Sequence, residues 1–258
     1  MPKEKTAKHT LRLMTYNMQV GIRTRRYGDY FRQGWRHVLP PAHPTRHLEP
    51  IVGMLQNHDL VAIQEADAGS YRTRSINLLH YLAERSGYPH WHLHNHRNLA
   101  PIARHGMGIL SRFPITRIDC HALPGRLPGR GVAIYRFGDG GQLTVVVTHL
   151  ALSERDRRLQ LSHIQNLVEG DEHVILMGDL NCETDELRRH PLFRERGFLH
   201  HPEVKPSFPS WQPDRVIDHI LVTPGIRILE GGPVDFAFSD HLPISMEVEL
   251  PEGISLTS

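Results

Sequence analysis

Cysteine is scarce in this 258-residue chain, and long uninterrupted apolar runs are absent from it. The two cysteines, Cys120 and Cys182, cannot build a disulfide framework, which favours a reduced, cytoplasmic protein. No stretch approaches the roughly 18–20 apolar residues of a membrane span, and the basic start precedes a strand pattern instead of a signal-peptide core. The formal net charge of +2 does not by itself indicate a nucleic-acid or membrane binder.

The length and even composition predict a single domain. The chain is long enough to bury a sizeable core, and no break in composition requires two domains. We expect a flexible N-terminal tail at 1–9, one domain at 10–251 and a C-terminal tail at 252–258. Strand-like and helical patterns alternate along the chain, which favours an α/β fold.

The stretch 174–181, Val-Ile-Leu-Met-Gly-Asp-Leu-Asn, is the one around which the chain is organised. Its four apolar residues predict a short strand buried on both faces. Asp179 and Asn181 follow at i and i+2, so an extended backbone would point both side chains the same way. Ligands in α/β proteins gather at the carboxyl ends of buried strands. The alternative is a strand-end turn in which both side chains bond local backbone groups.

Five more strand-like runs carry ligand-type or acid–base-type side chains at or near their ends. These side chains belong to Asn17, Gln64-Glu65, Thr148-His149, Ile217-Asp218-His219 and Ser239-Asp240-His241. Six such runs favour one shared site over six unrelated turns.

In their order, these motifs resemble those of the endonuclease/exonuclease/phosphatase superfamily, which includes DNase I-like nucleases, neutral sphingomyelinases and inositol-polyphosphate 5-phosphatases. They span residues 11–241, and Gly108–Ile115 is similar to a strand-and-turn segment common in the family. The resemblance implies a four-layer α/β sandwich of two packed mixed β-sheets flanked by helices. It places the site at one edge of that sandwich.

Several carboxylates gathered in one site would repel each other unless a cation lay among them. Oxygen ligands with open water positions favour Mg²⁺ or Mn²⁺, and no cysteine cluster competes for zinc. The resemblance implies that Glu65 and Asp240 hold the metal, with Asn17 close by.

The histidine of the last motif needs a partner. Adjacent residues of an extended strand point to opposite sides, so Asp218 is better placed than Asp240 to orient His241. Such a pair fixes the tautomer and suits His241 for proton transfer or for binding the transition-state phosphate.

The resemblance implies three further roles. His149 would donate to a non-bridging phosphate oxygen, while Asp179 and Asn181 would orient the attacking water. Whether Asp179 or His241 takes the water's proton stays open. Several DNase-like members support the Thr-His-Leu histidine with a carboxylate near Gly106. This chain has Arg104 and His105 there, so support for His149 must come from elsewhere.

Candidate substrate-binding residues lie outside these motifs. Arg25 and Arg26 belong to an arginine-rich segment interleaved with aromatics, which suits phosphate binding, and the alternative is a solvated loop. Arg130 ends a tandem Leu-Pro-Gly-Arg loop that either meets substrate phosphate or is a surface turn. Trp211 either floors the pocket or belongs to the core.

The periodicity predicts the remaining elements. We expect strands near 11–20, 90–94, 107–111 and 131–137, and helices near 47–57, 74–86, 153–169 and 184–196. Ser153 and Asp156 predict the start of the third helix, with Arg155, Arg157 and Arg158 on its solvated face.

The sequence therefore predicts a divalent-metal-dependent phosphoester hydrolase that attacks phosphorus with an activated water. The expected bond is a phosphodiester. The expected substrate is a compact anionic phosphoester, such as a lipid or inositol head group or a short oligonucleotide. The near-neutral charge disfavours long DNA. The alternatives are a DNA or RNA nuclease and a non-catalytic binding protein on the same fold. We expect no protein partner and a monomer.

Overall fold

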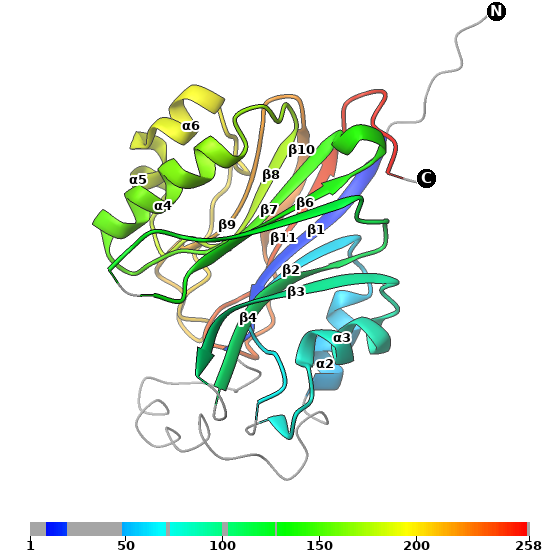
Figure 1. The fold of residues 1–258 in the computed structure, drawn as a ribbon. Coiled ribbons are helices and arrows are strands. Elements are labelled where there is room, and N and C mark those ends of the chain that lie inside the picture. The colour runs from blue at the N-terminus through cyan, green and yellow to red at the C-terminus, as the bar shows by residue number, and fades with distance from the viewer. Residues whose placement is uncertain (1–8, 20–47, 71–72, 100–102, 127, 257–258) are drawn as a thin grey trace, which may run out of the picture.

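The computed structural model describes residues 9–19, 48–70, 73–99, 103–126 and 128–256, and only the backbone of 96–99 and 103–105. Two mixed β-sheets pack face to face, and helices cover both outer faces (Figure 1). This arrangement confirms the predicted four-layer sandwich. Arg25 and Arg26 lie outside the described residues, as does the proposed N-terminal tail apart from His9.

The first sheet has six strands in the order β10-β11-β1-β2-β4-β3. They are β1 (Thr10–Asn17), β2 (Leu60–Asp67), β3 (His90–Leu99), β4 (Ala103–Ser111), β10 (Arg227–Pro233) and β11 (Ile244–Glu249). The central strands β1 and β2 run parallel, and Asn17 pairs with Gln64. The polar ends of these two strands therefore lie at the same edge.

The second sheet has five strands in the order β5-β6-β7-β8-β9. They are β5 (Arg117–Ala122), β6 (Gly131–Phe137), β7 (Leu143–His149), β8 (Val174–Asp179) and β9 (Asp218–Val222). In the register, His149 pairs with Asp179, and Asp179 pairs with Asp218. Three candidate catalytic residues thus stand in one row across neighbouring strands.

Burial of both faces explains the apolar runs of the central strands. Leu11 and Leu13 of β1 enter the core between the sheets, whereas Met14 and Tyr16 pack on the helical side. Because side chains alternate along a strand, a strand covered on both sides must be apolar at nearly every position.

Helices cover the outer face of each sheet (Figure 1). On the first sheet they are α2 (Glu49–Leu55) and α3 (Leu78–Ser86), and on the second α4 (Glu154–Leu167), α5 (Thr184–Arg189) and α6 (Pro191–Arg196). A 3-10 turn, η5 (Asp139–Gly141), precedes β7. No helix in the described part of the chain is long and apolar enough to cross a membrane.

Two predicted helices differ from those observed. The helix expected at 74–86 begins at Leu78, because Arg74 and Ser75 have positive φ angles of 54° and 65° and Asn77 caps the first turn. The helix expected at 184–196 is two helices that meet at His190. Pro191 disfavours a helical conformation at the residue before it, and His190 is extended.

Two other expectations differ from the structure. Arg157, placed on a solvated face by periodicity, is buried and bonds Glu186 through Nε and Nη2. At the C-terminus, Ile254 and Leu256 are buried in the core between the sheets. The folded unit therefore extends past the expected boundary at residue 251, at least to Leu256.

Candidate active site

Five strands bring polar side chains to one edge of the sandwich. Asn17, Glu65, His149 and Asp179 lie at or near the carboxyl ends of β1, β2, β7 and β8, and Asp218 begins the antiparallel β9. All but Glu65 are buried, and the side chain of Glu65 is 31% exposed. The shared site predicted from the sequence therefore has its physical basis in strand direction and register.

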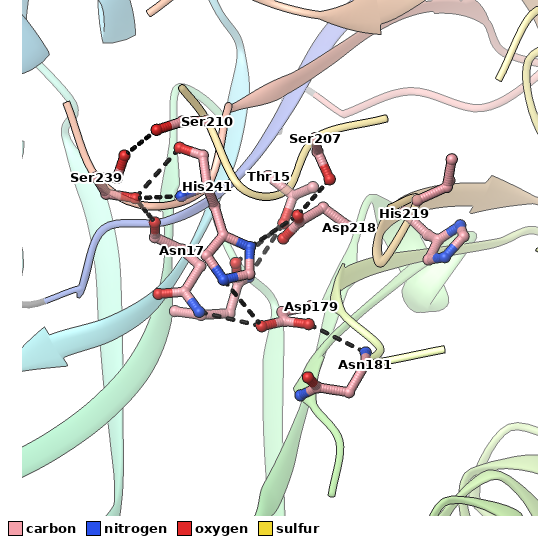
Figure 2. Close-up of polar contacts among 12 residues, drawn as sticks. Thr15, Asn17, Asp179, Asn181, Ser207, Ser210, Asp218, His219, Ser239 and His241 are labelled. Carbon is pink, nitrogen blue, oxygen red and sulfur yellow. Dashed lines mark hydrogen bonds and ion pairs between the residues drawn. The ribbon is translucent and has the colours of Figure 1, made fainter. Parts of the chain in front are cut away.

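The carboxylate of Asp179 is the centre of the cluster (Figure 2). Its Oδ2 accepts a hydrogen bond of 3.1 Å from Nδ2 of Asn17 and lies 3.3 Å from Nε2 of His149. Nε2 of His241 lies 3.8 Å from the same oxygen, and Oδ1 accepts from the backbone N–H of Asn181 at 3.0 Å. One oxygen thus faces three nitrogen-bearing side chains.

The backbone around Asp179 is set by close contact between β7 and β8. Gly178 has a φ of 151°, and a Cβ there would lie 1.9 Å from the carbonyl oxygen of Thr148. Asn181 is left-handed, with a φ of 52°, and its Nδ2 donates to the carbonyl of Leu150 at 2.9 Å. The extended geometry assumed from the i, i+2 spacing therefore ends before Asn181, whose amide ties β8 to the segment after β7.

Asp218 forms a hydrogen bond with the imidazole of His241, at Nδ1 and not at the Nε2 that faces Asp179 (Figure 2). This Nδ1 lies 2.8 Å from Oδ2 of Asp218, as strand geometry predicted. The same oxygen accepts from Oγ of Ser207 at 2.6 Å. The ring of Phe208 packs on the imidazole with 4.8 Å between centroids. The ring of His219, one residue after Asp218, points away and bonds the carbonyl of Cys182.

Sequence reasoning missed Ser207, Phe208 and Ser239. Oγ of Ser239 donates to the carbonyl of Asn17 at 2.6 Å and accepts from the backbone N–H of His241 at 3.0 Å. It therefore joins the last motif to the end of β1. Ser239 stands directly before Asp240 and His241 in the last motif, whereas Ser207 and Phe208 lie just before Trp211, which is half-buried.

The electrostatics couple Asp179 and His241. Burial raises the pKa of Asp179 to about 7, although the nearby His241 lowers it. Burial acts to lower the pKa of His241, but the carboxylates of Asp218 and Asp179 raise it to about 10. The arrangement stabilises an imidazolium beside a carboxylate that is costly to ionise.

Glu65 is aimed into the site by an irregularity in β2. The register between β2 and β4 shifts between Ile63 and Ala66, and Glu65 has a positive φ of 55°. Burial and the charge of Asp240 raise the pKa of Glu65, while His241 and Arg130 lower it. Glu65 therefore lies within electrostatic reach of one acid and two cations.

Two carboxylates lie near the imidazole of His149. Nε2 faces Asp179, and Nδ1 lies 4.0 Å from Oε1 of Glu65. No acid stands beside Gly106 in the sequence, and the carboxylates near His149 come from β8 and from the irregular part of β2.

Two sets of side chains qualify as metal ligands by chemistry. Asp179, Asp218 and His241 have ligand atoms within 4.8 Å of one another. In this set Nδ1 of His241 and Oδ2 of Asp218 are already bonded to each other, which suits proton transfer better than metal binding. Glu65 and Asp240 instead offer carboxylate oxygens whose mutual repulsion a cation would relieve. The second set fits a hard divalent ion.

Comparison with known families agrees with this fold. The model of the Endonuclease/Exonuclease/phosphatase family matches residues 14–241, which is most of the chain. The chain therefore belongs to the endonuclease/exonuclease/phosphatase family. A comparison with curated proteins gives no significant match.

Solved structures share the fold at low identity. An endonuclease/exonuclease/phosphatase from Beutenbergia cavernae is 22% identical with a TM-score of 0.70, over 94% of this chain and 72% of that one. The mannosyl-6-phosphatase Bt3783 from Bacteroides thetaiotaomicron is 16% identical with a TM-score of 0.63, over 92% and 99%. ANGEL2, a 2′,3′-cyclic phosphatase, is 12% identical with a TM-score of 0.66, over 94% and 96%.

Proposed function

We propose that this protein is a divalent-metal-dependent phosphoester hydrolase that attacks phosphorus with a water molecule. The observation that carries the proposal is the convergence of Asn17, His149 and His241 on one oxygen of Asp179, with Asp218 behind His241. Membership in a family of phosphoester hydrolases supports it. A protein that only binds its ligand would have no need for the buried row of Asp179, His241 and Asp218, in which an imidazole lies between two carboxylates.

The metal would be held by Glu65 and Asp240, with Asn17 beside them, and Mg²⁺ or Mn²⁺ suits these oxygen donors. A bound divalent ion supplies Lewis-acid polarisation of the phosphoryl oxygens and stabilises the charge of the leaving oxygen.

The residues of the chain position the water and move its proton. Asp179 accepts a hydrogen bond from the attacking water, whose oxygen forms a bond to phosphorus while the bond to the ester oxygen breaks. The released proton passes to the Asp179–His241 pair, in which Asp218 stabilises the imidazolium of His241 and the carboxylate of Asp179 is the group that can accept a proton. His149 donates to a non-bridging phosphate oxygen. Asn181 fixes the turn that holds Asp179 in place.

The substrate proposed is a compact anionic phosphoester. Two proteins of similar fold are named as a mannosyl-6-phosphatase and a 2′,3′-cyclic phosphatase, which supports a phosphoester substrate. A net charge of +2 provides little of the phosphate neutralisation on which binding to long DNA depends. A phosphodiester remains the expected bond type, and nuclease action is the competing outcome of the test below.

The test is a substrate screen with the purified protein in Mg²⁺, Mn²⁺ and excess chelator. The panel holds p-nitrophenyl phosphate, bis(p-nitrophenyl) phosphate, a short oligonucleotide, long duplex DNA and phosphorylated head groups. We expect metal-dependent hydrolysis of a small ester, lost in Asp179→Asn and kept in the matched control His219→Gln. Undiminished activity in chelator would exclude the metal-dependent mechanism, and efficient cleavage of long duplex DNA would favour a nuclease.

A further inference from the structure

The loop between β5 and β6 repeats the sequence Leu-Pro-Gly-Arg twice, at 123–126 and 127–130. Its described residues form one wall of a cleft of about 510 Å³, and His94 and Asn95 of β3 form another. Ligand pockets commonly enclose about 300–1,000 Å³, so the cleft has room for part of a small molecule. Nothing in the proposed reaction uses this cleft.

The cleft adjoins the candidate active site. Arg130, at the end of the loop, lines the cleft, and two residues later Val132 of β6 pairs with Thr148 of β7. The carbonyl of the next residue, Gly131, accepts a hydrogen bond of 3.0 Å from Oγ1 of Thr148, the neighbour of His149. A ligand extending from the catalytic edge past Arg130 would therefore enter the cleft.

Buried side chains of α4 hold the loop in place. Nε2 of Gln160 donates to the carbonyl of Pro124 at 3.0 Å, while its Oε1 accepts from the backbone N–H of Ala151 at 2.8 Å. Oδ2 of Asp156 accepts from the backbone N–H of Arg126 at 3.3 Å. One buried glutamine thus bonds both the loop and the segment after His149, which fixes the cleft relative to the site.

The lining of the cleft suits an anion. Arg126 and Arg130, both of which carry guanidinium groups, line it together with the polar residues His94 and Asn95. No carboxylate is found among the described residues that line it. Guanidinium groups bind phosphate and carboxylate oxygens with paired hydrogen bonds, and a loop fixed in advance loses little entropy on binding.

We propose that this cleft binds a second anionic group of the substrate, a phosphate or carboxylate beyond the scissile phosphate, and that Arg126 determines this specificity. The inference rests on the proposed function, since it assigns a substrate class to the same site. The sequence suggested Arg25 and Arg26 for the recognition of phosphate. Here the same kind of role is proposed for Arg126, which lies among the described residues.

The test compares substrates that differ by one phosphate. One pair is thymidylyl-thymidine with and without a 5′-terminal phosphate, and the other is glycerophosphoinositol with and without a 4-phosphate. In at least one pair the extra phosphate should raise kcat/KM about tenfold, as expected for one added charge-assisted contact. Arg126→Ala should abolish that preference through KM, with kcat little affected. The matched control Arg155→Ala, exposed on α4, should keep it.

The pair that shows the preference identifies the source of the anion, a nucleotide or an inositol head group. Equal kcat/KM within both pairs would overturn the inference, as would a preference that survives Arg126→Ala. Calorimetric binding of the same four compounds to the Asp179→Asn variant tests the cleft without turnover. If the unaltered protein hydrolyses neither these compounds nor any member of the panel above, the proposed function fails, and these affinities still decide the inference by the same comparison with Arg126→Ala.

Discussion

Nδ1 of His241 lies 2.8 Å from Oδ2 of Asp218, a residue 23 positions earlier in the chain. Two groups that act through one hydrogen bond should lose activity as a unit. We expect Asp218→Asn and His241→Ala each to lower kcat about 100-fold or more, and the double variant to lose little beyond either. Steady-state kinetics on bis(p-nitrophenyl) phosphate gives kcat for the unaltered protein, the two single variants and the double variant. Losses that multiply would show that the two residues act independently.

Ser207 offers a graded form of the same test. Its Oγ donates to the Oδ2 that holds His241, so Ser207→Ala should loosen the carboxylate without removing the pair. We expect a smaller loss of kcat, about tenfold. In a protein that already carries Asp218→Asn, Ser207→Ala should cause no further loss of kcat. A further loss of kcat there would show that Ser207 has a role apart from Asp218.

The carboxylates of Glu65 and Asp240 should hold the metal. Mn²⁺ binding, followed by electron paramagnetic resonance, should weaken at least about tenfold in Glu65→Gln and in Asp240→Asn, because hard cations depend on the number of charged oxygen ligands. The control is Glu183→Gln, which changes an exposed acid outside the cluster. Undiminished Mn²⁺ binding in the Glu65/Asp240 double variant would contradict the assignment.

Elements with strong internal patterns could be predicted from the sequence. The runs before Asn17 and Asp179 are largely apolar on both faces, because each strand lies between the other sheet and a layer of helices. The strand β5 escaped prediction because it lies at an edge and its residues Arg117–Ala122 are exposed or half-buried. Where neither face of a strand is buried, apolar and polar residues need not alternate, and the sequence then carries no pattern that predicts a strand.

The sequence indicated which side chains meet and that Asp218 faces His241, but not the backbone conformations that place them. Strand ends indicated which side chains meet, but the left-handed conformations of Glu65 and Asn181 follow from an irregular register and a tertiary hydrogen bond. The contacts of Ser239 with Asn17 likewise join segments 222 residues apart. Such contacts depend on tertiary packing, which a local pattern does not contain.

Gly178 should tolerate no side chain. A Cβ would lie 1.9 Å from the Thr148 carbonyl oxygen, and backbone cannot withdraw as a flexible side chain can. We expect Gly178→Ala to lower the free energy of unfolding by about 3 kcal/mol or more. In the control Gly53→Ala, within α2, a Cβ meets nothing within 4 Å, and a gain of up to about 1 kcal/mol is expected. Chemical denaturation measures both, and equal effects would contradict the argument.

Arg157 should matter far more to stability than its neighbour Arg155. Its guanidinium bonds both oxygens of Glu186, at 2.8 and 2.6 Å, and donates to the carbonyl of Leu152 at 2.6 Å. It thereby joins α4 to α5 and to the segment that follows His149. Arg157→Ala would leave Glu186 partly buried without its counter-charge, and the side chain of Glu186 is only 19% exposed.

We expect Arg157→Ala to cost about 3 kcal/mol of unfolding free energy, because breaking a buried pair leaves an uncompensated charge. Arg155→Ala changes an exposed side chain two residues earlier in the same helix. It should change the free energy of unfolding by no more than about 0.5 kcal/mol. The variant Arg157→Ala with Glu186→Gln should recover part of the loss, since it removes the stranded carboxylate as well. Guanidinium-chloride unfolding of the four proteins checks these values. A double variant less stable than Arg157→Ala would show that Glu186 has a stabilising role apart from this pair.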